Sequence, residues 1–214
     1  MKLTKLLERL DYKVVAGSDN IEITELVNDS RKVVPGSVFV CISGAVSDGH
    51  QYVKDVAEKG AAAVIVEKDV EVPEGLTVIK VEDTRYALAL MSAAYFGYPA
   101  EKLKTIGITG TKGKTTTTYM VKAILEEVGH KVGLIGTIEA IIGDKTIPSN
   151  NTTPESYTIQ KYFAQMVEAG CDCVVMEVSS QGLMLHRTAG IMFDIGIFTN
   201  LGEDHIGPNE HKDF

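Results

Sequence analysis

The sequence contains no run of about eighteen consecutive apolar residues, so a membrane-spanning helix is not expected. Residues 1–10 carry too much charge for the core of a signal peptide, and their leucine spacing predicts a short amphipathic helix instead. Cysteine is scarce: only Cys41, Cys171 and Cys173 occur, and their spacing matches no metal-binding motif. We therefore expect reduced thiols in a cytoplasmic protein, with Cys171 and Cys173 as small buried residues.

Positive charge is also in short supply. The 214 residues include 21 Lys and Arg against 29 Asp and Glu, which gives a formal net charge of −8. This balance argues against nucleic acid as the main partner, and no membrane partner is expected either. An anionic ligand would need cations concentrated at its site. The hydrophobic content of 44% and charged content of 23% are those of a globular protein.

Three glycines, Gly107, Gly110 and Gly113, lie where an apolar β-branched run gives way to a run of helix-forming residues. A strand, a glycine-rich loop and a helix in this order form a phosphate cradle. Lys114 would reach the outer phosphates, and Thr115 would hold Mg²⁺. Position 108 is isoleucine where the strict motif needs glycine, so the loop is a variant. The residues predicted to bind the nucleotide are Gly110, Thr111, Lys112, Gly113, Lys114, Thr115 and Thr116.

The hydrophobic pattern changes near Gly97-Tyr98-Pro99, which ends a predicted helix at residues 83–96. We expect an α/β protein in which residues 1–100 form a small N-terminal domain. Residues 101–214 alternate strands and helices and predict part of a P-loop, Rossmann-like parallel sheet covered by helices. The expected strands are 12–15, 21–27, 38–42, 61–66, 76–81, 105–109, 132–136, 173–178 and 194–198. The other expected helices are 52–59, 114–128 and 155–169, and residues 137–154 are expected to form a polar loop.

Polar side chains follow three of the predicted strands. Parallel sheets bind ligands beyond the carboxyl ends of their strands, so the cradle, the segment 177–180 and the segment 200–205 should share one rim. Glu177 ends a buried strand and would hold Mg²⁺ opposite the cradle, although such a glutamate can also cap a helix or pair with a surface cation. Asp204, His205 and His211 are further metal or phosphate candidates.

The N-terminal part offers weaker signals. Arg31 and Lys32 lie in a turn rich in Asp, Ser, Pro and Gly, which by itself is typical of a solvated turn. A loop at residues 43–51 precedes a predicted helix, and its glycines would allow a ligand to approach the backbone. His50 in that loop is either a helix cap or a ligand contact.

Taken in order, the motifs resemble those of the Mur ligases. They are Thr-Gly-Thr-Lys-Gly-Lys-Thr-Thr at 109–116, Asn-Thr-Thr-Pro at 151–154, Glu-Val-Ser-Ser at 177–180, His-Arg at 186–187 and Thr-Asn-Leu-Gly-Glu-Asp-His at 199–205. Asp-Ser-Arg at 29–31, followed by Pro35-Gly36, resembles the start of the family's uridine-nucleotide domain. The resemblance covers nearly the whole chain.

This resemblance implies an ATP- and Mg²⁺-dependent ligase of peptidoglycan precursor synthesis. It would add a diamino acid, lysine or meso-diaminopimelate, to UDP-MurNAc-L-Ala-D-Glu through an acyl phosphate. The implied catalytic residues are Lys114, Glu177 and His205, and the implied metal ligands are Thr115, Glu177 and His205. The residues implied to bind the UDP substrate are Ser30, Arg31, His50, Gln51, Asn151, Thr152, Thr153, Ser179 and Arg187.

The chain departs from the family pattern in three places. Leu185 stands where many members carry a polar residue, and the stretch from Asp204 to His211 is two residues longer than usual. In the family, the chain continues beyond the point that corresponds to Phe214. We therefore expect a fragment that lacks the rest of the ATPase domain and the domain that binds the amino acid. A half-built parallel sheet would expose an unpaired strand edge.

Several other functions remain open. A small P-loop kinase needs the same cradle but not the segments 151–154 and 177–180, and a regulatory nucleotide-binding module needs no chemistry. Within the family, the nearest competitors are an enzyme that adds D-Ala-D-Ala and a folylpolyglutamate synthetase. The motifs at 29–31 and 151–154 favour the diamino acid ligase.

An incomplete ligase is expected to show no turnover by itself. ADP release measured with UDP-MurNAc-L-Ala-D-Glu, ATP and a diamino acid should stay at background. Robust turnover by the 214-residue chain would refute this expectation.

Overall fold

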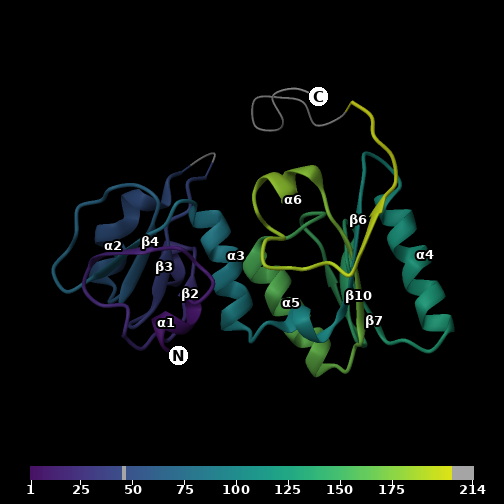
Figure 1. The fold of residues 1–214 in the computed structure, drawn as a ribbon, viewed down its shortest axis with the longest axis horizontal. Helices are drawn as coiled ribbons and strands as arrows, with labels where there is room; N and C mark the ends of the chain where they lie inside the picture. The colour runs from purple at the N-terminus through teal and green to yellow at the C-terminus, as the bar shows by residue number, and fades with distance from the viewer. Residues whose placement is uncertain (45–46, 204–214) are drawn as a thin grey trace. The chain divides into compact units, whose positions relative to one another are not determined.

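The computed structural model describes residues 1–44 and 47–203 (Figure 1). The chain divides into two compact units, Met1–Tyr95 and Phe96–Phe214. Each unit contains a mainly parallel sheet with helices, which confirms the expected α/β class. None of the helices formed by the described residues combines the length and hydrophobicity needed to cross a bilayer.

The first unit is built on a five-stranded sheet with strand order β1-β5-β4-β3-β2. Strands β2 to β5 are parallel, and β1 pairs with β5 in the antiparallel direction. Strands β3 and β4 are buried along their whole length, as expected for central parallel strands. The elements are α1 (Leu3–Leu6), β1 (Lys13–Ala16), β2 (Leu26–Val27), β3 (Val38–Val40), α2 (Val53–Glu58), β4 (Ala63–Val66), β5 (Thr77–Lys80) and α3 (Thr84–Tyr95), with 3₁₀ turns at Ser30–Lys32 and Gly49–Tyr52.

The N-terminal segment differs from expectation. The predicted helix over residues 1–10 is reduced to the four residues of α1, and the predicted strand over 21–27 to the two residues of β2. The backbone gives the reason, because the Leu3 N–H donates to the Ile21 carbonyl at 2.9 Å and the Ile23 N–H donates to the Met1 carbonyl at 2.7 Å. The chain before β2 is thus paired with the N-terminus rather than with the sheet.

The second unit has a six-stranded sheet with strand order β11-β6-β10-β7-β8-β9. Its first four strands are parallel. Along β10, Val174 and Met176 pack on one face with α5, while Val175 packs on the other face in the cluster that α4 joins. The elements are β6 (Lys104–Thr109), α4 (Lys114–Glu127), β7 (Val132–Ile135), β8 (Glu139–Ile142), β9 (Lys145–Pro148), α5 (Ser156–Glu168), β10 (Cys173–Glu177), α6 (Ser180–Met184) and β11 (Ile195–Phe198), with a 3₁₀ turn at Pro99–Lys102.

The loop predicted over residues 137–154 is wrong in its middle, because β8 and β9 form an antiparallel hairpin there. Burial alternates along β8, with Ala140 and Ile142 inside. The hairpin turns at Gly143, which has a φ of +57° and is followed by Asp144. Gly-Asp between two short alternating runs is a hairpin signal that the polar composition of the surrounding segment obscured.

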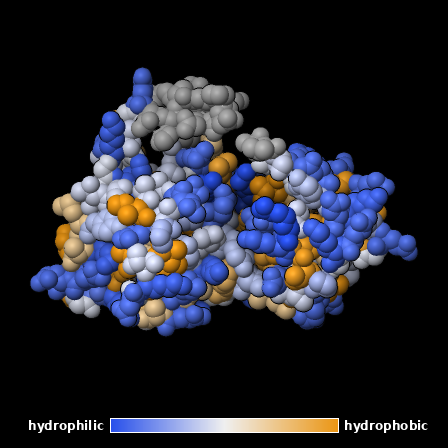
Figure 2. Space-filling model, turned by 180° about the vertical axis from the view of Figure 1, so that it is seen from behind, coloured by the Kyte–Doolittle hydropathy of each residue, from blue (hydrophilic) through white to orange (hydrophobic). Residues whose placement is uncertain are grey.

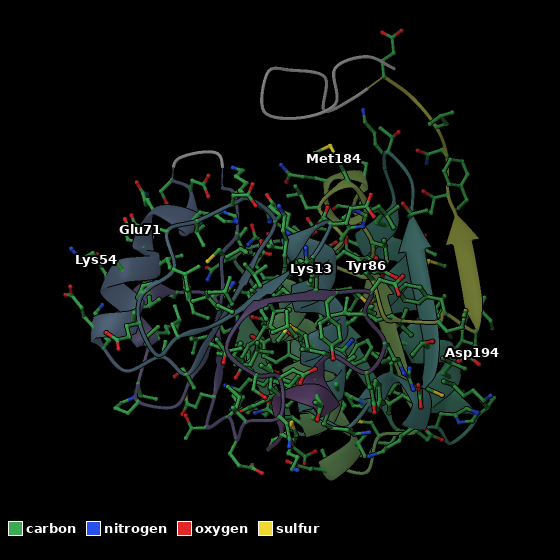
Figure 3. All side chains as sticks on the ribbon, turned by 60° about the vertical axis from the view of Figure 1, so that its left-hand side comes forward. Lys13, Lys54, Glu71, Tyr86, Met184 and Asp194 are labelled. Atoms are coloured by element: carbon green, nitrogen blue, oxygen red, sulfur yellow. The ribbon has the colours of Figure 1, made fainter. Side chains whose placement is uncertain are left out.

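Strand β11 forms one edge of this sheet and pairs only with β6 among the described residues, so the expected open edge is present. Ile195 and Phe198 on this strand are 52% and 62% exposed. Asp194, at the start of β11 in Figure 3, accepts hydrogen bonds from the Thr105 N–H at 2.8 Å and the Thr105 hydroxyl at 3.2 Å. The face shown in Figure 2 is mostly hydrophilic, with smaller groups of hydrophobic residues.

Replacement of Phe163 by alanine tests the core beneath α5. Phe163 is fully buried in the cluster formed with β10, so Phe163→Ala should lower the free energy of unfolding by about 3–5 kcal/mol. Met120→Ala is the control, since Met120 on α4 is 59% exposed and its loss should change stability by about 0.5 kcal/mol or less. Chemical denaturation measures the difference, and equal effects would contradict the assigned core.

Candidate functional site

The phosphate cradle joins β6 to α4. Gly113, with a φ of +84°, immediately precedes the first helical residue, Lys114. The N–H groups in the first turn of α4 have no acceptor within the helix and carry the positive end of its dipole. The Lys114 ammonium folds back over the loop and donates to the carbonyl oxygens of Gly110 at 2.6 Å and Thr111 at 3.2 Å. The Lys114 ammonium and the N-terminus of α4 therefore both lie at this loop.

The segment after β11 clamps this loop. The Thr111 N–H donates to the Asn200 carbonyl and the Lys112 N–H to the Asn200 side-chain oxygen, each at 3.0 Å. The Asn200 amide in turn donates to the Lys112 carbonyl at 2.9 Å. Gly110 has a φ of +131°, and a Cβ at this position would lie 2.2 Å from the Thr199 hydroxyl oxygen. Only glycine fits there, which explains why the variant motif places its glycine at this point.

Glu177 brings a buried carboxylate to the cradle, with 1% of the residue exposed. One carboxylate oxygen accepts from the Thr115 hydroxyl at 2.9 Å and the Thr137 hydroxyl at 3.0 Å. The other accepts from the Thr137 N–H at 2.9 Å. Gly136 leaves room for it, because a Cβ there would come within 2.4 Å of this second oxygen.

The donor set around Glu177 suits a hard divalent cation. Within residues 1–44 and 47–203, no lysine or arginine forms an ion pair with this carboxylate. A buried carboxylate is costly unless it is compensated, and a carboxylate beside a threonine hydroxyl offers the oxygen ligands that Mg²⁺ prefers. The residues predicted to hold Mg²⁺, Thr115 and Glu177, are thus adjacent.

Thr137 was missed by sequence reasoning. It lies just after β7, in the segment predicted as a polar loop, and its hydroxyl also meets the Thr152 hydroxyl at 3.0 Å. Thr137 therefore connects the metal-ligand candidate Glu177 to the predicted substrate segment 151–154. The available signal was its place directly after a buried strand.

A cavity of about 280 Å³ opens beside Lys114. It brings together five residues that the sequence predicted for the UDP substrate. Two of them also stabilise the surrounding fold. The Thr153 hydroxyl donates to the Glu177 carbonyl, and the Ser179 hydroxyl caps the N-terminus of α6. The lining residues are Lys114, Thr137, Asn150, Asn151, Thr152, Thr153, Ser179, Ser180, Gln181 and Arg187.

Arg187 supplies a second cation to this cavity. Its guanidinium donates to the Thr153 carbonyl at 2.9 Å and pairs with Glu155 at 2.7 Å. Its Nε is buried and has no partner among the described residues. A buried donor without an acceptor is unusual in a native structure and is consistent with a ligand-binding role.

A second carboxylate, that of Glu139, lies near the cradle helix and binds Tyr119. The Tyr119 hydroxyl on α4 donates to the Glu139 carboxylate on β8 at 2.7 Å. Burial, together with this hydrogen bond and the charges of Glu139 and Glu177, raises the pKa of Tyr119 to about 12. The hydroxyl of Tyr119 thus remains a hydrogen-bond donor to Glu139 even at alkaline pH.

A larger cavity of about 630 Å³ lies in the first unit, after β2 and β3. Ser30 and Arg31, both predicted to hold UDP, line it. The Arg31 guanidinium binds both carboxylate oxygens of Asp29 at 2.9 Å and lowers the pKa of Asp29 to about 2. The lining residues are Asn28, Asp29, Ser30, Arg31, Lys32, Phe39, Ile42, Ser47, Gly49 and Tyr52.

His50 and Gln51 do not line this cavity. The His50 ring is held on both sides, because Nδ1 lies 2.6 Å from Asp48 and Nε2 accepts from the Glu67 N–H at 3.1 Å. This arrangement fixes the loop after β3 to the end of β4. The roles of His50 and Gln51 in UDP binding stay predictions, and His205, Asp204 and His211 lie outside the described residues.

Two protein-family models match this chain. The Mur ligase middle domain matches residues 108–214, which is half of the chain, and the profile described as Mur ligase family, catalytic domain, matches residues 22–96. The chain belongs to the Mur ligase family. The matched ranges include the cradle, Glu177 and the residues that line the cavity in the first unit.

Individual Mur ligases show the same relationship. The UDP-N-acetylmuramoyl-L-alanyl-D-glutamate--2,6-diaminopimelate ligase of Clostridium perfringens is 50% identical over 214 residues, which are all of this chain and 44% of that protein. The enzyme with the same name from Bacillus licheniformis is 48% identical over 211 residues, 98% of this chain and 43% of that protein. The chain thus spans less than half the length of these relatives.

Solved structures agree in fold. A structure of a UDP-N-acetylmuramoyl-L-alanyl-D-glutamate--2,6-diaminopimelate ligase matches with a TM-score of 0.79 at 23% identity, over 97% of this chain and 42% of that one. The MurF ligase from Thermotoga maritima in complex with ADP matches with a TM-score of 0.54 at 24% identity, over 85% of this chain and 38% of that one. At these identities the likeness shows the fold.

Substitution of Gly110 tests the clamp on the cradle. Gly110→Ala should push residues 199 and 200 away, so the Thr111 and Lys112 N–H groups should exchange with deuterium at least about tenfold faster, a loss of about 1.4 kcal/mol of local protection. Gly196→Ala is the matched control, because a Cβ there meets open space. Unchanged exchange at both amides in Gly110→Ala would contradict the clamp.

Proposed function

We propose that this chain carries the ATP-binding and UDP-substrate-binding parts of a ligase that joins 2,6-diaminopimelate to UDP-MurNAc-L-Ala-D-Glu. The observation that carries the proposal is the buried Glu177 carboxylate, which the cradle residue Thr115 contacts at 2.9 Å beside the cavity that Lys114 and Arg187 line. A phosphate cradle, a metal ligand and a site for an acidic substrate are adjacent there.

The ATP side rests on the chain's own donors. The first turn of α4 and Lys114 would bind the β- and γ-phosphates, and Lys114 would leave its loop carbonyls to do so. Thr115 and Glu177 would hold Mg²⁺, which offsets the negative charge on the phosphates when it is bound. His205 stays a prediction for a second Mg²⁺.

The acceptor side uses the 280 Å³ cavity. Asn151, Thr152 and Arg187 would orient the glutamyl end of the substrate toward Lys114. The substrate carboxylate would attack the γ-phosphate of ATP, giving an acyl phosphate and ADP. The amine of the diamino acid would then displace phosphate and form the amide, with the amine proton leaving to solvent or a base. Lys114 would stabilise the charge on the transferring group.

The uridine nucleotide belongs to the first unit in this proposal. The 630 Å³ cavity combines the cationic Arg31 and Lys32 with the partly exposed aromatic residue Tyr52. Cations suit a diphosphate, and aromatic side chains suit a pyrimidine ring. These local cations provide what a chain of net charge −8 needs to bind two anionic nucleotides.

The choice among diamino acids and family members rests on the relatives. The proteins of 44–50% identity carry the name of a 2,6-diaminopimelate ligase, so we assign that acceptor rather than lysine, D-Ala-D-Ala or a folate. A cytoplasmic location fits a substrate activated by nucleotides and three free cysteines.

Calorimetric binding of Mg-ATP and of UDP-MurNAc-L-Ala-D-Glu to the chain tests this assignment. Lys114→Ala should weaken Mg-ATP binding about tenfold to a hundredfold, because it removes a charge-assisted hydrogen bond to phosphate. The UDP substrate should still bind that variant through the first unit. Lys161→Ala, at an exposed lysine of α5, is the control and should bind both ligands normally.

The outcomes separate the alternatives. Loss of ATP binding in Lys114→Ala without any binding of the UDP substrate would indicate a P-loop protein of another class. Unchanged ATP binding in Lys114→Ala would refute the cradle. ATP–ADP isotope exchange that depends on UDP-MurNAc-L-Ala-D-Glu would favour the ligase over a kinase.

A further inference from the structure

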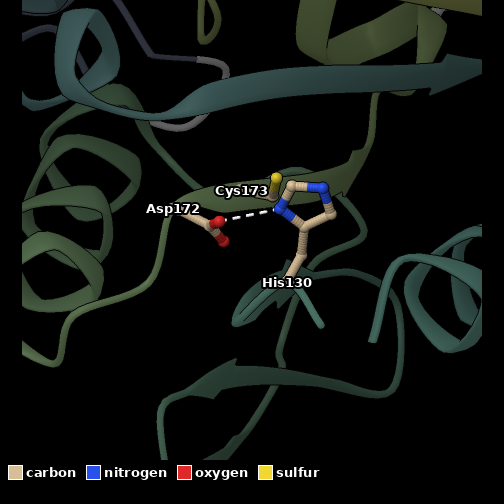
Figure 4. Close-up of side chains that lie close together, drawn as sticks. All are labelled: His130, Asp172 and Cys173. Atoms are coloured by element: carbon tan, nitrogen blue, oxygen red, sulfur yellow. Dashed lines mark hydrogen bonds and ion pairs between the residues drawn. The ribbon is translucent and has the colours of Figure 1, made fainter. Parts of the chain in front are cut away.

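A second group of reactive side chains lies at the opposite end of the sheet. His130 follows α4 just before β7, and Asp172 and Cys173 stand at the start of β10. Strands β7 and β10 are parallel neighbours in which Cys173 pairs with Val132, so the amino ends of the two strands bring these side chains together (Figure 4). The cradle follows the carboxyl ends of the strands, so this group is separate from the nucleotide site.

The geometry of the group is compact. His130 Nδ1 lies 2.7 Å from Asp172 Oδ2, and the ligand atoms of His130, Asp172 and Cys173 all lie within 4.8 Å of one another. The second carboxylate oxygen of Asp172 accepts from the Lys131 N–H at 2.9 Å. This backbone contact orients the carboxylate, as outer contacts do at known metal centres.

We propose that His130, Asp172 and Cys173 bind a divalent transition metal of the zinc class. Imidazole nitrogen, carboxylate oxygen and thiolate sulfur are the three ligand types that Zn²⁺ takes, and they select it over Mg²⁺. Three protein ligands leave a fourth position for water or a further ligand.

The distances require only a small closure. Zinc bonds of about 2.0–2.3 Å place tetrahedral ligands about 3.5 Å apart. The His130 and Asp172 ligand atoms, now 2.7 Å apart, would have to open slightly, and no pair in the group is more than 4.8 Å apart, so each adjustment is on the order of 1 Å. The His130 side chain is 43% exposed and can rotate without disturbing the core, while the Lys131 N–H holds the Asp172 carboxylate in place. Cys173 is 3% exposed and supplies the fixed ligand.

A surface ion pair between His130 and Asp172 accounts for two of the three groups. The Cys173 side chain packs in the core cluster with Val132 and Val175, and its sulfur also lies within 4.8 Å of the ligand atoms of both partners, a proximity that core packing by itself does not require. Burial, followed by the charge of Asp172, raises the pKa of the Cys173 thiol, so metal binding must displace its proton. Binding is therefore best measured at mildly alkaline pH.

Titration of the metal-free chain with Co²⁺ tests the site, because a cobalt–thiolate bond produces a near-ultraviolet charge-transfer band. One equivalent of Co²⁺ should produce this band, and Zn²⁺ should abolish it. Cobalt bound at the oxygen ligands of Glu177 and Thr115 gives no such band, so the nucleotide site does not interfere. Absence of the band at one equivalent would overturn the proposal.

Two cysteine variants assign the sulfur. Cys173→Ser should lose the band, whereas Cys171→Ser, at another buried cysteine two residues earlier, should keep it. The reverse result would overturn the assignment. His130→Gln changes an exposed side chain and should weaken Co²⁺ binding about tenfold or more, which provides a test even if Cys173→Ser does not fold. Unchanged affinity in His130→Gln would also contradict the site.

Discussion

The buried Glu177 carboxylate is the contact on which the arrangement of the nucleotide site depends. A charge with 1% of its residue exposed must be compensated, and here hydroxyl and N–H donors from α4 and from the end of β7 surround it. The carbonyl of the same residue accepts from Thr153, which begins the segment leading to α5. One residue at the end of β10 therefore sets the position of the cradle helix and of the predicted substrate segment together.

The second constraint is the clamp between the cradle and residues 199–202. Asn200 occupies the N–H groups of Thr111 and Lys112, so an incoming phosphate would rely on the helix start and on Lys114. Lys114 already lies over the loop, held by two carbonyl oxygens. Exchange of carbonyl contacts for phosphate contacts would keep the ammonium hydrogen-bonded, so Lys114 would gain a charged partner without leaving a partly buried donor unpaired.

The sequence predicted which residues would meet at this rim where the prediction depends on local order, and their roles in binding stay predictions. The cradle and Glu177 were predictable because a glycine-rich turn and a carboxylate each follow a buried strand, and parallel strands bring such positions to one rim. Thr137 was missed although it directly follows a predicted buried strand, because threonine there carries no charge or motif and its contact with Glu177 exists only once β7 and β10 pair. His50 was left open because one of its two ring partners, Glu67, comes within reach only when β3 and β4 pair. The cysteine spacing likewise could not show that His130, just before β7, lies beside Cys173 at the start of the neighbouring strand β10.

Strand β10 carries different chemistry at its two ends. Glu177 at the carboxyl end offers hard oxygen ligands together with Thr115, whereas Cys173 at the amino end offers sulfur together with His130. The two positions are four residues apart, which is about 13 Å in an extended strand. Ligand hardness separates the ions that each end prefers, with Mg²⁺ favoured by oxygen and zinc-class metals by nitrogen and sulfur. Strand β10 can therefore carry two separate metal sites. Mg²⁺ would find nitrogen and sulfur rather than an all-oxygen ligand set beside Cys173, and a zinc-class metal would find oxygen rather than nitrogen and sulfur at Glu177 and Thr115.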